Sequence, residues 1–271
     1  MRRAIAVAMF ILGLAASSAR AADAPKHPGW LADPQTHCRV WDSNVEPDER
    51  VQWKGACKNG VAEGPGVLRW TSEKTDETIE GTLQAGRIEG RALVTTAIGS
   101  RIEAEFHNSM LEGVAVVTQI DGTKTTMHYH EDKQVGRVQV VWPNGEKLDG
   151  EIDENQQMHG IRTAPDGSKY EGDLKNFMPD GKGAFIRADG LRYKGDFAGG
   201  QIAGEGEMLF SDGGVYQGTF RDGKPNGHGT MRAANGQIYR GFWVDGCLSQ
   251  ANSDNGTWAA SGRSAASCGF N

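Results

Sequence analysis

Four cysteines are the first residues in this sequence that point to chemistry, because thiols form disulfides, bind metals or act as nucleophiles. They are Cys38, Cys57, Cys247 and Cys268. None lies in Cys-x-x-Cys spacing, so the sequence carries no zinc signature. Four cysteines allow three connectivities. Because two lie early in the chain and two near its end, we predict the disulfides Cys38–Cys57 and Cys247–Cys268, with free buried thiols as the alternative.

Histidines and carboxylates are the next candidates for chemistry. His128 and His130 would project from one face of a strand, with Asp132 in phase, and such a set could bind a transition metal. Two solvated histidines on a polar face are the interpretation we favour. Glu205 and Glu207 alternate in the same way, and a solvated face explains them better than an acid/base pair.

Glycine pairs of the form Gly-x-Gly could cradle a phosphate. Three of them recur, at Gly181/Gly183, Gly204/Gly206 and Gly227/Gly229. They lack the third glycine of a dinucleotide-binding fingerprint and open no helix, so we interpret them as strand glycines. The sequence therefore predicts no catalytic residue, no metal site and no cofactor, and a protein that is not an enzyme.

The elements that position these residues form a repeat. Glycine is the compositional outlier, at 38 of 271 residues, about twice its average usage. Gly172, Gly195, Gly218 and Gly241 are each 23 residues apart. Each lies two residues after a tyrosine and two residues before Leu, Phe or Trp. In the first three copies a Gly-x-Gly pair begins nine residues later, and an Asp-Gly or Asn-Gly closes the unit.

This pattern resembles the MORN repeat, because spacing and residue type agree over consecutive copies. Looser copies begin upstream, at Trp53, Ile79, Ile102, Met127 and Leu148. Together they give about eight full units and one truncated unit over residues 50–248. The segment from Cys38 to Cys57 is similar to the cysteine-bearing opening of exported bacterial MORN repeat-containing proteins. The resemblance implies a role in protein–protein interaction or assembly.

Alternation along each strand predicts the fold. Tyr170, Gly172 and Leu174 share one face, and Glu171 and Asp173 share the other. A single hairpin of this kind is marginal in water, so the units must stack to bury their rings. We expect an all-β fold, an elongated single-layer array of stacked antiparallel β-hairpins (MORN repeats) with disulfide-stapled caps.

One upstream unit departs from the pattern. In the unit that begins at Met127, we place Tyr129 where the repeat has glycine and Glu131 where it has an aromatic residue. Seven residues rather than nine then separate Tyr129 from Gly136. A bulky residue there would block close packing, which predicts a bend or irregular twist near residues 100–145. Decay of the repeat and a functional hinge are the two interpretations.

The chain begins with the features of an export signal. Arg2 and Arg3 precede an apolar run over residues 4–16, which is too short to span a bilayer, and Ala19 and Ala21 form a small-x-small cleavage site. We predict a signal peptide over residues 1–21, an N-terminal cap over 22–49, the repeat array over 50–248 and a C-terminal cap or tail over 249–271. Export to the periplasm or beyond the cell places the chain in an oxidising compartment, where disulfides are expected.

The net charge of the chain disfavours some classes of ligand. The full chain has a net charge of −6; cleavage removes three arginines and leaves 26 basic and 35 acidic residues, a net charge of −9. Such a chain disfavours nucleic acid and contact with anionic membranes. We predict a non-catalytic periplasmic or secreted scaffold that mediates protein–protein interaction or assembly in the cell envelope, with an unidentified envelope protein as partner. The alternatives are a lipid- or polysaccharide-binding protein and, less favoured, a hydrolase acting on an envelope polymer.

Aromatic residues are the candidate binding surface, since Tyr and Trp are favoured at interfaces. The candidates are Tyr170, Tyr193, Tyr216, Tyr239, Tyr129 and Glu131. The alternative is that these rings only fill the core of the repeat. Open sheet edges also invite pairing between copies, so the sequence is compatible with a homodimer.

Overall fold

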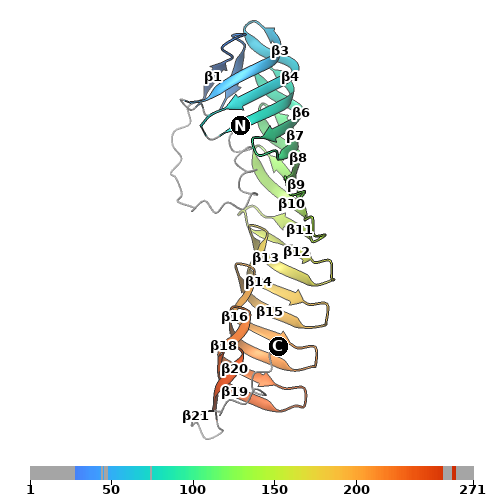
Figure 1. The fold of residues 1–271 in the computed structure, drawn as a ribbon, viewed down its shortest axis with the longest axis vertical. Coiled ribbons are helices and arrows are strands. Elements are labelled where there is room, and N and C mark those ends of the chain that lie inside the picture. The colour runs from blue at the N-terminus through green and yellow to red at the C-terminus, as the bar shows by residue number, and fades with distance from the viewer. Residues whose placement is uncertain (1–27, 44, 46–47, 74, 253–257, 261–271) are drawn as a thin grey trace. The chain divides into compact units, whose positions relative to one another are not determined.

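Every described element of regular structure is a β-strand (Figure 1). The computed structural model describes residues 28–43, 45, 48–73, 75–252 and 258–260. The predicted signal peptide (1–21), Cys268 and most of the predicted C-terminal tail lie outside these residues. Within them there is no helix with the length and apolar character needed to cross a membrane. Contacts divide the chain into two units, residues 1–143 with 152–156, and residues 144–151 with 157–271.

The first unit is a succession of antiparallel hairpins. From β3 to β10, each strand pairs antiparallel with the next one along the chain. The short strands β1 and β2 pair with each other, and β2 meets β4 in parallel at Arg39 and Val61. The strands are β1 (Gly29–Ala32), β2 (Arg39–Asp42), β3 (Arg50–Lys58), β4 (Val61–Thr71), β5 (Asp76–Gln84), β6 (Arg87–Thr96), β7 (Arg101–His107), β8 (Met110–Thr118), β9 (Lys124–His130) and β10 (Lys133–Val141).

The second unit repeats this arrangement. Each strand from β12 to β20 pairs antiparallel with its successor. The strands are β11 (Lys147–Ile152), β12 (Met158–Thr163), β13 (Lys169–Lys175), β14 (Met178–Ile186), β15 (Arg192–Ala198), β16 (Gln201–Leu209), β17 (Val215–Arg221), β18 (Lys224–Arg232), β19 (Ile238–Val244), β20 (Cys247–Asn252) and β21 (Trp258–Ala260). The predicted all-β fold, an open sheet of sequential antiparallel hairpins, is confirmed.

A ladder of aromatic rings forms the core of the second unit. The rings meet edge to face, with interplanar angles of 82–85° and centroid distances of 4.9–5.3 Å. In order along the ladder they are Tyr170, Phe197, Tyr193, Phe220, Tyr216 and Trp243. This geometry suits the charge distribution of aromatic rings. Contacts within one strand alternate with contacts between neighbouring hairpins, such as Tyr193 with Phe220, so the ladder joins each repeat to the next.

The repeat glycines give the tyrosine rings room to lie against the backbone. Gly195 and Gly206 face each other across β15 and β16, and the ring of Tyr193 lies over both. A Cβ atom at Gly206 would lie 2.5 Å from Cε2 of Tyr193 and 2.6 Å from its Cζ. The Tyr193 hydroxyl donates a hydrogen bond to the carbonyl of Asp196, at 3.0 Å. The Tyr-x-Gly spacing therefore encodes a flat ring contact that any side chain would block.

The register of β9 shows that our placement of Tyr129 at the glycine position was wrong. Gly113 pairs with Tyr129, as Gly204 pairs with Phe220 in the second unit. Tyr129 is therefore at the Phe position of the repeat, and its ring is 3% exposed. The seven residues from Tyr129 to Gly136 match the seven from Phe220 to Gly227. The pairing of β7 to β10 keeps the pattern of the other hairpins, so the substitutions there cause no irregular register.

The same register shows how this hairpin keeps its core filled. Ala115 pairs with Met127 and Val117 with Thr125, so Met127 is at the glycine position and Thr125 at the tyrosine position. Both side chains are buried, at 1% and 0% exposure. Thr125 is smaller than the tyrosine of the other repeats and Met127 is larger than their glycine. The Met127 sulfur accepts a hydrogen bond from the Tyr129 hydroxyl at 3.6 Å. Large and small residues have exchanged places.

A disulfide fixes the start of the first unit, as predicted. Cys38 and Cys57 are bonded, with their Cα atoms 5.8 Å apart. Beside them the carboxylate of the buried Asp33 accepts a hydrogen bond from the backbone of Trp53 at 2.6 Å, on the edge strand β3. Cys247 is also disulfide-bonded, while its predicted partner, Cys268, lies outside the described residues.

Removal of the first disulfide is expected to destabilise the first unit. The bridge closes a loop with a sequence separation of 19, for which chain-entropy arguments give about 3 kcal/mol. Cys38→Ser with Cys57→Ser should lower the urea midpoint with little change in the slope of the transition. Oxidised and reduced wild-type protein provide the matched comparison. Equal midpoints for all three would show that the bridge does not staple this end of the sheet.

Candidate functional site

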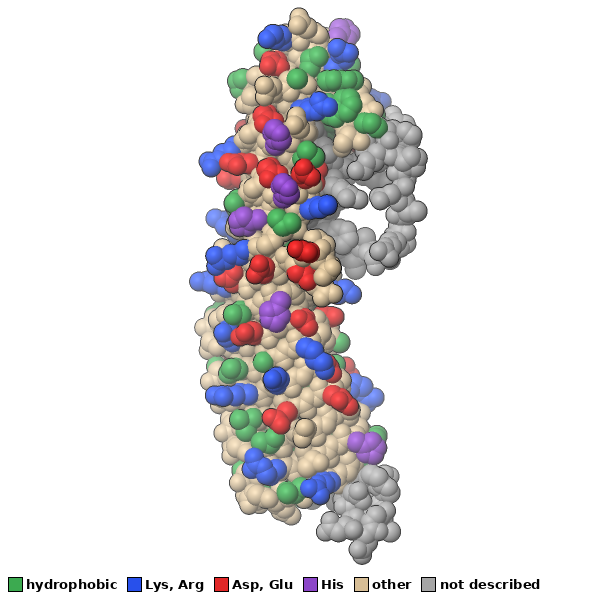
Figure 2. Space-filling model, turned by 180° about the vertical axis from the view of Figure 1, so that it is seen from behind, with side chains coloured by type: hydrophobic (Ala, Val, Ile, Leu, Met, Phe, Trp, Pro, Cys, Tyr) green, Lys and Arg blue, Asp and Glu red, His purple; other side chains and the backbone are tan. Residues whose placement is uncertain are grey.

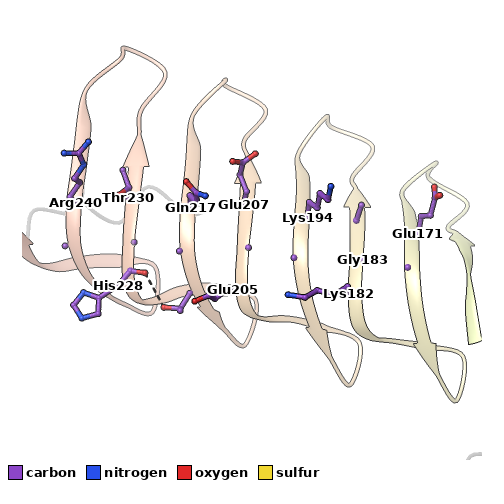
Figure 3. A pocket seen from close by; sticks show the side chains of 18 of the residues that line it. Glu171, Lys182, Gly183, Lys194, Glu205, Glu207, Gln217, His228, Thr230 and Arg240 are labelled. Atoms are coloured by element: carbon purple, nitrogen blue, oxygen red, sulfur yellow. Dashed lines mark hydrogen bonds between the residues drawn. The ribbon is translucent and has the colours of Figure 1, made fainter. Parts of the chain in front are cut away.

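A groove of about 1040 Å³ crosses strands β12 to β19 of the second unit, on the face opposite the aromatic ladder (Figure 3). Its floor is a row of glycines that lie opposite one another in successive strands. The row comprises Gly160, Gly172, Gly183, Gly195, Gly206, Gly218, Gly229 and Gly241. At about 4.8 Å per strand, the row is about 34 Å long. We call this feature the glycine groove.

The floor is bare backbone because of strand alternation. At the six glycines of this row from Gly172 to Gly229 the side-chain direction points to the other face, where the tyrosine rings lie. The residues before and after each glycine point into the groove and form its two flanks. The upper flank in Figure 3 includes Glu171, Lys194, Glu207, Gln217, Thr230 and Arg240, and the lower flank includes Lys182, Glu205 and His228. The strand pairing adds Ala184, opposite Lys194, to the upper flank, and Thr219, opposite Glu205, and His159, opposite Asp173, to the lower one.

Some charges in the groove are already paired. Lys182 contacts Asp196 at 2.5 Å, and the hydrogen bond from Lys182 is the main cause of a lowered Asp196 pKa. His159 contacts Asp173 at 3.2 Å. Across the strands Lys194 lies directly opposite Glu207, but neither forms an ion pair within 4 Å in the described part of the chain.

Glu205 and Arg240 also remain available, together with Glu207. Glu205, Glu207 and Arg240 are exposed and make no ion pair with any described residue. Acidic and basic side chains are interspersed over the face seen in Figure 2 rather than gathered in patches of one sign. The groove therefore offers exposed donors, acceptors and charges of both signs along a line.

The groove lining lacks the arrangement that nucleophilic catalysis needs. It contains neither Ser nor Cys. Of its other possible nucleophiles, Thr219 donates a hydrogen bond to the carbonyl of Asn226 and Lys182 pairs with Asp196, so neither is activated by a neighbouring base. No group of three or more His, Cys, Asp or Glu in the described residues is placed to hold a metal ion.

The predicted histidine pair is engaged locally. His130 Nδ1 lies 3.0 Å from Glu112, whose hydrogen bond raises the pKa of His130, and His128 Nδ1 lies 3.1 Å from the carbonyl of Arg137. Glu112 also accepts a hydrogen bond from the backbone of Glu131. These contacts fasten the turn after β9 to the preceding hairpin.

Of the predicted surface residues, four are buried in the structure and two are exposed. Tyr170, Tyr193 and Tyr216 are 4%, 1% and 0% exposed and belong to the core, as does Tyr129. Their rings therefore cannot be the surface that meets a partner, because neighbouring hairpins cover them. Tyr239 is 37% exposed and Glu131 lies exposed at a turn. The residues of the glycine groove were not identified from the sequence as a binding surface, although they are the polar neighbours of each repeat glycine in the sequence.

Because these tyrosines are buried, we expect the stability of the fold to fall at alkaline pH. Burial raises the pKa of Tyr170, Tyr193 and Tyr216 to about 12, and it also raises that of Tyr129. An acid whose folded pKa is raised stabilises the fold fully below its unfolded pKa, about 10, and loses that contribution as the pH rises toward 12.

Absorbance at 295 nm is the direct measurement. We expect most tyrosinate to appear above pH 11 in the folded protein and near pH 10 in guanidinium chloride. The urea midpoint should fall between pH 10 and 12. Full ionisation near pH 10 in the folded protein, without unfolding, would contradict the burial of these rings.

Fold and groove define the class of protein: a β-hairpin repeat protein that presents a continuous surface. The MORN repeat family model matches residues 55–74, 170–192, 193–215 and 216–238. The chain is thus a MORN repeat-containing protein with four MORN repeats. The last three copies are contiguous and carry most of the groove. No curated protein matches the chain significantly.

Proposed function

We propose that this protein is an exported, non-catalytic scaffold of the cell envelope, and that the glycine groove binds a segment of a partner protein. MORN repeats generally bind proteins or membranes and are typically non-catalytic. The observation that carries the proposal is the groove itself, with its bare floor and with Lys194, Glu207 and Arg240 on its flanks, which form no ion pair with a described residue. A site of about 34 Å suits an extended chain better than a compact small molecule.

Other features of the chain support this proposal. Charges of both signs, including Lys194 and Glu207, favour a polypeptide over a polyanion. The Cys38–Cys57 disulfide fits an oxidising compartment, as the signal-like segment over residues 1–21 does. Repeat arrays of this kind use long surfaces for recognition.

The test is capture of a partner by crosslinking. A variant with altered groove charges is compared with a control variant whose altered charges lie outside the groove. The groove variant exchanges charges, Lys194→Glu with Glu207→Lys, and so keeps the net charge. The control exchanges Arg91→Glu with Glu105→Arg, an exposed cross-strand ion pair of 3.2 Å in the first unit. We expect one envelope protein to be crosslinked by wild type and control and lost from the groove variant. Equal capture by all three would reject the groove as the binding surface.

The predicted export of the protein is tested separately. N-terminal sequencing of protein recovered from the periplasmic or culture fraction should begin near Ala22. Protein that keeps Met1 and stays in the cytoplasm would contradict the envelope role. Binding to anionic vesicles or to an envelope polysaccharide, with no protein captured, would instead favour the lipid or polysaccharide alternative.

A further inference from the structure

We propose that the glycine groove recognises a partner segment in the polyproline II conformation, which crosses one hairpin for every three of its residues. The inference rests on the proposed function, and it specifies the conformation and charge pattern of the bound segment. It follows from the period of the flanks, from their charges and from their excess of hydrogen-bond donors.

The period of the groove matches polyproline II. Equivalent residues of successive hairpins are two strands apart, about 9.6 Å. Polyproline II rises about 3.1 Å per residue with three residues per turn, so every third residue returns to the same face after about 9.3 Å. A segment lying along the floor would therefore present the same side to every repeat.

Other regular conformations fit the period less well. An extended β-segment returns to the same face every two residues, after about 6.7 Å. An α-helix returns every 5.4 Å, and its width of about 10 Å exceeds the two-residue spacing between the flanks. Neither conformation returns to the same face after one hairpin of about 9.6 Å: the extended segment does so after about 6.7 Å, and two helical turns rise about 10.8 Å.

The flanks are also rich in hydrogen-bond donors. Lys194, Gln217, Thr230, Arg240 and His228 all line the groove. Polyproline II forms no internal hydrogen bonds, so its carbonyls need outside donors, and proline offers no N–H in return. An acceptor-rich ligand thus complements the donor-rich flanks.

Charges set the register of the segment. On the first strands of the four hairpins, the equivalent upper-flank residues are Glu171, Lys194, Gln217 and Arg240 (Figure 3). The complementary segment carries a basic, an acidic, a polar and an acidic residue at every third position. Glu205 and Glu207 lie between these positions and disfavour a polyanion. One aromatic ring, Phe242, lies on the groove face at the last strand, where it packs against His228; the rest of the lining offers no ring to stack on sugars.

Short peptides test the period. The matched peptide is KPPEPPSPPE, with EPPSPPEPPK as its reverse. The control KPEPSPEPPP has the same composition with charges at alternate positions, and KGSEGSSGSE keeps the three-residue spacing without prolines. Dye-labelled peptides are titrated with the mature protein at low salt and followed by fluorescence anisotropy. We expect one direction of the matched peptide to bind about tenfold more tightly than either control.

A charge swap tests the register. Lys194→Glu should weaken binding of the matched peptide about fivefold, and KPPKPPSPPE should restore it. The variant Arg91→Glu, outside the groove, should change nothing. Equal binding of matched and control peptides, or no rescue, would overturn the polyproline II inference. Binding of a β-1,4-linked N-acetylglucosamine hexamer to the groove in place of the peptides would also overturn it. If the peptide test fails but a native partner is still captured in a groove-dependent way, only the polyproline II inference is rejected, and the proposed scaffold function is retained.

Discussion

Gly218→Met is expected to destabilise the second unit by about 3 kcal/mol, and adding Tyr216→Thr is expected to recover part of that loss. A Cβ at Gly218 would lie 2.5 Å from the carbonyl oxygen of His228, 2.6 Å from Cα of Gly229 and 2.7 Å from the hydroxyl oxygen of Tyr216. Only the last of these contacts is removed by Tyr216→Thr, so the recovery is partial. In β9 the protein itself combines Thr125 with Met127 at these two positions. Thr at position 216 would free the space of the ring for the new Met side chain.

A double-mutant cycle measures this exchange. Tyr216→Thr alone removes a buried ring and should cost about 3 kcal/mol. If the two residues share one space, the double variant should be at least about 1 kcal/mol more stable than the sum of the single losses. Gln217→Met, on the exposed groove face of the same strand, is the control and should stay within about 0.5 kcal/mol of wild type. Additive losses would show that the compensation in β9 depends on its neighbours, Ala115 and Val138.

Phe220→Ala is expected to have an equally large effect, because it breaks the aromatic ladder. The Phe220 ring is 4% exposed and meets Tyr193 and Tyr216, both at 5.1 Å between centroids. Truncation of a buried Phe costs about 3–5 kcal/mol. The loss should lie at the boundary between adjacent hairpins, since Tyr193 and Tyr216 belong to different repeats.

Phe242→Ala provides the matched control. Phe242 is only partly buried and contacts the exposed His228 on the groove face, at 5.3 Å. Its truncation should cost about 1 kcal/mol or less. Urea unfolding followed by circular dichroism gives both values, and hydrogen exchange locates the loosened hairpins. Similar losses for Phe220→Ala and Phe242→Ala would mean that the ladder is not the main stabilising core of this unit.

The error at Tyr129 shows where sequence reasoning fails in this fold. Side chains in a strand alternate with a period of two, so a shift of two residues leaves every residue on its own face. Alternation alone therefore could not tell whether Tyr129 or Met127 occupies the glycine position. Only the pairing of Gly113 with Tyr129 fixed the register.

The sequence by itself determined the repeat, the antiparallel hairpins, the burial side of each strand and the Cys38–Cys57 disulfide. These are local properties: a 23-residue spacing, a period of two and positions along the chain. The tertiary structure decided that Tyr170, Tyr193 and Tyr216 are core while Tyr239 is exposed. It also decided that the glycines of the second unit form one continuous row, and that Lys194, Glu207 and Arg240 beside it make no ion pair with a described residue. The reason is physical: a groove and its unpaired charges depend on which residues face each other across strands, and cross-strand distances are set by the stacking of hairpins.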